Sequence, residues 1–144
     1  MTEELNTGLL LFLPYRAMEA RVFEELAAAG FEDITPSQAR VFQRIASTGS
    51  RLGDLARQAG ITKQSAGFLV DQLERLGYVY RAPDPDDGRA RLIRIAERGH
   101  RGVEASRAVV ARVEAEWEAH LGARRMAQLR RILADLREIT DPWR

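Results

Sequence analysis

The clearest chemical signal in this sequence is a carboxylate-rich turn followed by closely spaced arginines. Residues 84–95 read DPDDGRARLIRI, so three aspartates precede Arg89, Arg91 and Arg94. Arginine presents several donors in a rigid plane, which suits phosphates and base edges. The stretch therefore indicates a cationic tip whose chemistry suits a nucleic acid.

A β-hairpin is the element that would present this tip. Aromatic and β-branched residues at positions 78–81 predict its first arm, and the run at 92–95 predicts its second. Turn chemistry lies between the arms, at Pro83, Pro85, Asp86 and Gly88. We expect Pro83 to end regular pairing because it lacks a backbone donor. A hairpin this short is marginal alone, so it must pack against a larger support.

A second polar set lies at the start of the helix that is predicted just before the hairpin. The sequence ITKQSAGFLVDQLERLG offers Thr62 as N-cap, an apolar stripe that ends at Leu76, and Gly77 as terminator. Short donors and acceptors on the other face suit base edges, and the free amides at the helix start suit phosphates. The alternative is an ordinary solvated face. The polar positions are Thr62, Lys63, Gln64, Ser65, Gly67, Asp71 and Gln72.

Two further helices are predicted upstream. TPSQARVFQRIA opens with Thr35 as N-cap, Pro36 at the first helical position and Gln38 closing a capping box. RLGDLARQAG then predicts a two-turn helix that stops at Gly60. The order helix, helix, strand, turn, strand indicates a helix-turn-helix with a wing, whose second helix can enter the major groove of DNA.

Long helical patterns occupy both ends of the chain. Residues 7–29 are apolar on nearly every side, so we expect this helix to be buried against more than one partner, with a kink or restart at Pro14. Residues 97–119 and 122–140 carry apolar stripes that a small winged domain cannot cover, which favours a dimer interface. We therefore expect a mainly α fold with a small β-hairpin wing. It forms a single domain, 1–144, with a winged helix-turn-helix at 34–97 and dimerisation helices at 5–30 and 98–140.

Composition and charge narrow the class of protein. The 144 residues are 45% hydrophobic and include no cysteine, which favours one folded domain and excludes disulfides and thiolate metal sites. The net charge is only +1, but residues 51–101 hold ten Lys or Arg against seven Asp or Glu, so the middle of the chain is its basic part. Such an excess fits either a nucleic-acid partner or an ordinary solvated helical surface. The N-terminus lacks the positive charge of a signal peptide, and the apolar run at 9–13 is too short to span a bilayer. We expect a soluble, cytoplasmic protein.

An enzymatic role finds little support in the sequence. The two histidines, His100 and His120, lie about five and a half turns apart on one predicted helix, too far to share a metal ion or form a catalytic pair. We expect no catalytic residue, no metal and no cofactor.

Over essentially its whole length the chain resembles the MarR family of bacterial transcriptional regulators. The family's helix that precedes the helix-turn-helix is similar to TPSQARVFQRIA. Its helix-turn-helix, with the recognition helix, and its first wing strand are similar to LGDLARQAGITKQSAGFLVDQLERLGYVYR. PDPDDGRARLIRIAERG resembles the wing signature. The resemblance implies that Arg89 enters the minor groove, that Asp87 holds Arg89 in place, and that Arg91 also faces DNA.

Three positions depart from the family pattern. Gly88 stands where many members carry a second basic residue, and Ala96 replaces a threonine that would cap the next helix. Phe68 takes a recognition-helix position that is often arginine. Phe68 could contact thymine methyl groups, but we expect it to pack against a neighbouring helix.

The resemblance implies a sequence-specific repressor that binds a pseudo-palindromic operator as a homodimer and is released by a small lipophilic or phenolic ligand. Candidate ligand-binding residues are Phe12, Tyr15 and Arg16, although a core Tyr15 and a solvated Arg16 are the simpler interpretation. The expected partners are double-stranded DNA, a second copy of the chain and a small-molecule effector, and no membrane. The alternative function is a winged-helix module that binds a protein and does not read DNA.

Overall fold

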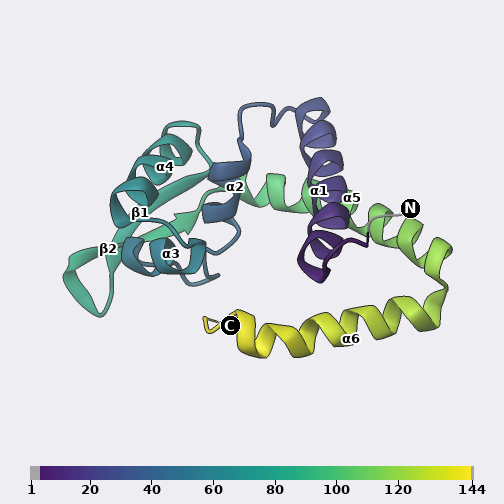
Figure 1. Cartoon of the computed structure of the whole chain (residues 1–144). Coiled ribbons are helices and arrows are strands. Elements are labelled where there is room, and N and C mark those ends of the chain that lie inside the picture. The colour runs from purple at the N-terminus through teal and green to yellow at the C-terminus, as the bar shows by residue number, and fades with distance from the viewer. Residues whose placement is uncertain (1–3, 144) are drawn as a thin grey trace. The chain divides into compact units, whose positions relative to one another are not determined.

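The computed structural model describes residues 4–143, and within them the chain is mainly helical with one antiparallel hairpin (Figure 1). This confirms the expected fold class. The elements, in chain order, are α1 (Thr7–Ala28), α2 (Pro36–Phe42), α3 (Leu52–Ala59), α4 (Lys63–Arg75), β1 (Val79–Asp84), β2 (Asp87–Ile95), α5 (Glu97–Leu121) and α6 (Ala123–Thr140).

The chain divides into two compact units. One is Ala29–Glu104, which holds α2, α3, α4, the hairpin and the first turns of α5. The other is formed by the chain ends, up to Ala28 and from Ala105 onward, and holds α1, the rest of α5 and α6.

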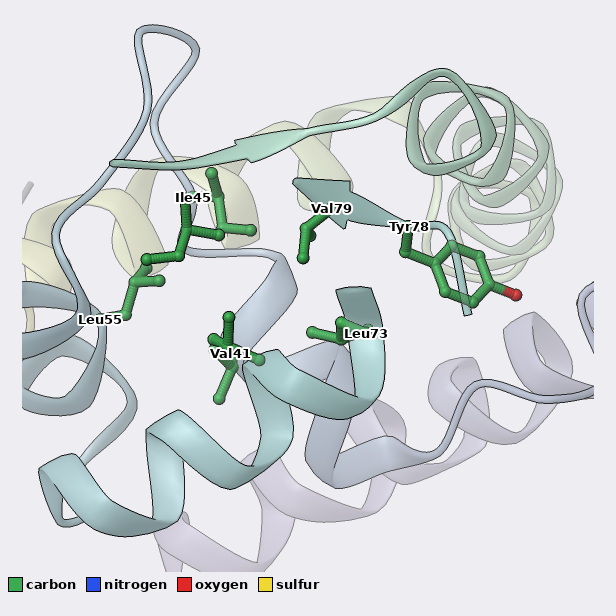
Figure 2. Close-up of a cluster of buried hydrophobic side chains, with 8 residues drawn as sticks. Val41, Ile45, Leu55, Leu73, Tyr78 and Val79 are labelled. Carbon is green, nitrogen blue, oxygen red and sulfur yellow. The ribbon is translucent and has the colours of Figure 1, made fainter. Parts of the chain in front are cut away.

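The unit Ala29–Glu104 has a hydrophobic core to which α2, α3, α4 and the hairpin contribute (Figure 2). Tyr78 closes one end of this core, with its hydroxyl pointing away from the other labelled side chains (Figure 2). Side chains from three helices and both strands meet here, so the hairpin has the support that its small size requires. The buried cluster consists of Val41, Ile45, Leu55, Val70, Leu73, Tyr78, Val79 and Ile93.

The helix ends in this unit follow the local signals in the sequence. Thr35 caps α2 by accepting from the Gln38 amide at 3.3 Å, and the Gln38 side chain accepts from the Thr35 amide at 3.0 Å. Gly60 ends α3 in the left-handed conformation, with φ of 70°. Gly77 ends α4 in the same way, with φ of 85°. The capping box and both glycine ends are therefore confirmed.

Both strands of the hairpin extend beyond the predicted arms. The register runs from Val79↔Ile95 to Pro83↔Arg91 and shifts before Asp84↔Asp87. The regular register thus ends at Pro83, as expected, and only the irregular pair Asp84↔Asp87 follows it. Pro83 lies on a strand with a free edge, where the missing donor is tolerated. Beside β2, Ser50 exchanges backbone hydrogen bonds with Ile93 at 2.8 and 3.0 Å and so forms an isolated β-bridge at the edge of the hairpin.

In the unit of the chain ends, α1 runs unbroken through Pro14. The helix therefore does not restart there, because the loss of one backbone donor is offset by helical turns on both sides. Arg21 of α1 pairs with Glu116 of α5 at 2.8 Å, and Arg130 of α6 pairs with Glu114 of α5 at 2.9 Å. The buried apolar residues of this unit are Leu26, Val109, Val113 and Met126.

The apolar start of α1 is exposed in the single chain, and its burial against more than one partner stays a prediction. The leucines at 9, 10, 11 and 13 are between 38% and 55% exposed, and Ile139 of α6 is 82% exposed. A single chain thus leaves two apolar helical surfaces in solvent. No helix among residues 4–143 is long and apolar enough to cross a membrane.

Candidate nucleic-acid interface

The N-terminus of α4 presents a row of exposed polar side chains. Thr62 accepts a hydrogen bond from the Ser65 amide at 3.0 Å, which confirms its role as N-cap. Lys63, Gln64 and Ser65 form the exposed first turn. The residues of the first turn of α4 that are predicted to contact DNA therefore lie together. Free backbone amides and the positive end of the helix dipole point outward at the same place.

The opposite face of α4 fixes the helix in the core. Ala66, Val70 and Leu73 are fully buried. Gly67 is half-buried, and a Cβ at this position would lie 3.5 Å from Leu52 of α3. Gly67 thus faces the neighbouring helix.

Buried Gln38 of α2 donates a hydrogen bond to the side chain of Gln72 on α4 at 3.0 Å. Because Gln38 also closes the capping box of α2, the two helices are fixed to each other by one carboxamide. Gln72 therefore has a structural partner in addition to its place on the polar face.

The turn of the wing is held by a buried carboxylate. Asp84 is 6% exposed, and its Oδ2 lies 2.9 Å from Nε and 2.6 Å from Nη2 of Arg51, the residue before α3. Its Oδ1 accepts the backbone amide of Asp86 at 2.9 Å. The hydrogen bond from Asp86 and the ion pair with Arg51 hold the pKa of the Asp84 carboxyl below its usual value.

Arg89 lies exposed beside this turn. The register leaves residues 88–90 between the pairs Asp84↔Asp87 and Pro83↔Arg91, so Arg89 belongs to an irregular segment of β2. Asp87 accepts the backbone amide of Arg89 at 3.0 Å, so it fixes the main chain that carries the guanidinium. Arg91 is exposed two residues further along the strand.

The base of the wing is tied to α4 by Arg81. Its guanidinium contacts Asp71 at 2.8 Å and Glu74 at 2.7 Å. Two carboxylates near the residues of α4 that are predicted to contact DNA are thus paired with a cation. This pairing weakens the repulsion between the carboxylates and a phosphate backbone. The sequence placed Asp71 on the polar face of α4 but gave no sign of this partner.

Phe68 is 59% exposed, so the expectation that it packs against a neighbouring helix is wrong. The apolar stripe of α4 lies on the other side of the helix, and the core is filled without Phe68. Its ring therefore extends from the same outward surface as Gln64.

The predicted ligand-binding residues lie on α1, in the unit of the chain ends. Phe12 and Tyr15 are 50% and 45% exposed. The Tyr15 hydroxyl donates to Glu19 at 3.0 Å, and Arg16 contacts the same carboxylate at 3.4 Å. The core position considered for Tyr15 is thus wrong. An open groove on α6 is lined by other residues, namely Gln128, Arg131, Ile132, Ala134 and Asp135.

A partly buried ion pair that the sequence did not indicate supports the winged unit. Arg98 contacts the Asp33 carboxylate at 2.9 Å and lies 4.4 Å over the Tyr78 ring, while the Tyr78 hydroxyl donates to Asp33. Burial acts to raise the pKa of the Asp33 carboxyl, but the bonds from Tyr78 and Arg98 outweigh it and hold the pKa below its usual value. Burial and the Asp33 carboxylate both raise the pKa of Tyr78.

Comparison with known proteins identifies similar chains. A sequence model described as MarR family matches residues 32–90. The HTH-type transcriptional regulator FarR of Neisseria gonorrhoeae is 28% identical over 138 residues, which cover 95% of this chain and 91% of FarR.

Two solved structures share the fold. A MarR-family protein of Mycobacterium tuberculosis in complex with salicylic acid is 25% identical, with a TM-score of 0.66 over 94% of this chain and 99% of that one. A point mutant of MepR from S. aureus, bound to an oligodeoxyribonucleotide, is 21% identical, with a TM-score of 0.61 over 95% of this chain and 99% of that one.

Proposed function

Because this chain belongs to the MarR family of transcriptional regulators, we propose that it represses transcription as a homodimer bound to a pseudo-palindromic operator. The family is DNA-binding and has a winged helix-turn-helix fold.

One observation carries the proposed mode of reading. An exposed polar turn at the start of α4 is followed in the same compact unit by an exposed Arg89, whose backbone is fixed by Asp87. In this mode α4 lies in the major groove, where Lys63, Gln64 and Ser65 meet base edges and phosphates. Arg89, with Arg91 behind it, extends into the adjacent minor groove, whose negative potential attracts guanidinium groups.

Homodimer formation is supported by the apolar surfaces of the chain ends. Exposed leucines at the start of α1 and exposed residues of α6 up to Ile139 need a partner, and a second copy offers the same surfaces. Two copies related by a two-fold axis present two reader helices, which matches the symmetry of a palindromic operator.

Release by a small lipophilic or phenolic ligand is supported by the relative from M. tuberculosis, which holds salicylic acid. In this chain Phe12 and Tyr15 offer apolar and aromatic surface on α1, and Arg16 offers a cation for a carboxylate or phenolate. A ligand that binds the DNA-free form more tightly than the DNA-bound form would lower operator affinity.

Fluorescence anisotropy tests the proposal, with the full chain on the DNA upstream of its own gene and on a scrambled duplex over a range of salt. We expect a preference of about a thousandfold or more, which falls as salt rises. Arg89→Ala should weaken operator binding by about tenfold or more and reduce the salt slope by about one.

The matched control is Arg101→Ala, which removes an equal charge from an exposed arginine of α5 that pairs with Glu97. This variant should bind the operator nearly as well as the wild type. Weak binding of the wild type to both duplexes, and to a pool of random duplexes, would overturn the DNA-reading function and favour a wing that serves a protein partner.

A further inference from the structure

Phe68 is an apolar ring held in solvent on the surface that we assign to DNA. Its side chain is 59% exposed, the highest value among the large hydrophobic residues of the unit Ala29–Glu104. Phe31 and Phe42 of the same unit instead pack against the core, where each ring lies within 6.4 Å of the Tyr78 ring centre. The exposure of Phe68 is therefore particular to its place on α4.

The neighbours of Phe68 on the helix surface are polar. Gln64 precedes it by four residues and Arg75 follows it by seven, spacings that put all three side chains on one face of α4. Gln64 and Arg75 are exposed. Phe68 is thus a single apolar group in the middle of a row of hydrogen-bonding side chains.

The surroundings identify the kind of group that Phe68 can contact. In the major groove the base edges present donors and acceptors, and the one apolar group among them is the C5-methyl of thymine. A single ring flanked by polar side chains matches one methyl flanked by polar base edges. A protein partner would need a broader apolar patch than one ring in a polar row provides.

We propose that Phe68 contacts a thymine C5-methyl in each half-site of the operator and so sets the base preference at that position. This inference rests on the proposed function, because it requires α4 to lie in the major groove. Gln64, one turn nearer the start of the helix, reads a neighbouring base pair through its carboxamide.

Deoxyuridine substitution tests the contact, because deoxyuridine differs from thymidine at this base edge only by the missing methyl. The operator is first selected from random duplexes with the full-length wild-type protein. Each thymine of one half-site is then replaced in turn, and binding is measured by fluorescence anisotropy. We expect one or two positions at which the wild type loses about fourfold in affinity, the effect of one buried methyl.

Substitutions of the protein separate this contact from others. For Phe68→Ala we expect weaker operator binding and loss of the sensitivity to deoxyuridine at those positions, while Phe68→Leu keeps part of it. Gln64→Ala is the matched control on the same face, and it should bind more weakly yet keep the fourfold effect. Because Phe68 is exposed, the melting temperature of each Phe68 variant should stay close to that of the wild type.

The two possible failures are distinguishable. If the wild type selects a sequence but no thymine methyl affects its affinity, or if Phe68→Ala keeps the full deoxyuridine effect, the assignment of Phe68 is wrong and the proposed function stands. If no sequence is selected at all, the proposed function is wrong and the role of Phe68 in reading DNA is wrong with it.

Discussion

Arg51 Nη2 lies 2.6 Å from Oδ2 of Asp84, and this contact joins the start of α3 to the turn of the wing. The Asp84 carboxylate is buried and also accepts the Asp86 amide, so both sides of the turn are fixed by one side chain. The orientation of the segment that carries Arg89 therefore depends on a residue outside the hairpin.

Asp84→Asn tests whether this carboxylate positions the wing. Removing a negative charge would by itself strengthen binding to a phosphate backbone. We expect the opposite, a weaker operator affinity, because the asparagine loses the charge-assisted contact with Arg51 and frees the turn. Fluorescence anisotropy at low and high salt measures the effect, and a gain in affinity would show that the contact does not matter for reading.

A double-mutant cycle supplies the control. If Asp84 acts through Arg89, the effect of Asp84→Asn should largely vanish in an Arg89→Ala background, since the residue that it positions is already missing. Additive losses in affinity would instead mean that the two residues act independently.

Much of the fold was predictable because its signals are local. Thr35 and Thr62 cap helices, and Gly60 and Gly77 end them, through contacts within a few residues along the chain. Such short-range chemistry can be read from sequence. Both strands extend beyond the predicted arms, to Asp84 in β1 and from Asp87 in β2. This was missed because whether a strand position tolerates proline depends on which of its edges is free, which requires the completed sheet.

The exposed positions of the candidate site could be predicted from the sequence, but the contacts that support them could not. The ion pairs Arg51 with Asp84 and Arg98 with Asp33 join residues 33 and 65 positions apart, and no local pattern marks such pairs. Phe68 is a different case. The apolar stripe of α4 already placed it on the outward face, and the expectation of packing relied only on its apolar character.

Gly99 and Gly102 on α5 offer a matched pair for stability. A Cβ at Gly99 would lie 2.3 Å from the Tyr78 carbonyl oxygen and 2.8 Å from Ile95, whereas a Cβ at Gly102 meets nothing closer than 3.8 Å. We expect Gly99→Ala to lower the free energy of unfolding by about 3 kcal/mol or more through overpacking. Gly102→Ala should be neutral or stabilise by up to about 1 kcal/mol through helix propensity. Urea unfolding followed by circular dichroism measures both, and similar values for the two variants would contradict the packing of α5 against Tyr78.

The hydroxyl of Tyr78 predicts a loss of stability at alkaline pH. Burial and the Asp33 carboxylate raise the pKa of Tyr78 above its ordinary value near 10, so the unfolded chain loses this proton first as pH rises. Its contribution to stability is complete below pH 10 and is lost as pH rises through the folded pKa. Tyr78→Phe should therefore flatten the decline of unfolding free energy above pH 10 by up to about 1.4 kcal/mol per pH unit.

Below pH 10, Tyr78→Phe should be less stable than the wild type by about 1–2 kcal/mol, because phenylalanine lacks the hydroxyl that donates to the Asp33 carboxylate. Tyr80→Phe on the adjacent strand is the control, since Tyr80 is 45% exposed. It should keep the wild-type slope above pH 10. Equal slopes for the wild type and Tyr78→Phe would show that the Tyr78 proton does not contribute to the alkaline decline.

Ile139→Glu tests the proposed dimer surface on α6. Ile139 is 82% exposed in the single chain, and in a two-fold dimer each change occurs twice. Loss of two buried apolar side chains and gain of two charges should weaken dimerisation by about two orders of magnitude or more, measured by sedimentation velocity. Operator affinity should fall with it, because a monomer reads only one half-site.

Ala127→Glu is the control, because it adds the same charge on the face of α6 opposite its apolar stripe, where Ala127 is exposed. This variant should remain dimeric. A fully dimeric Ile139→Glu protein would place the interface elsewhere.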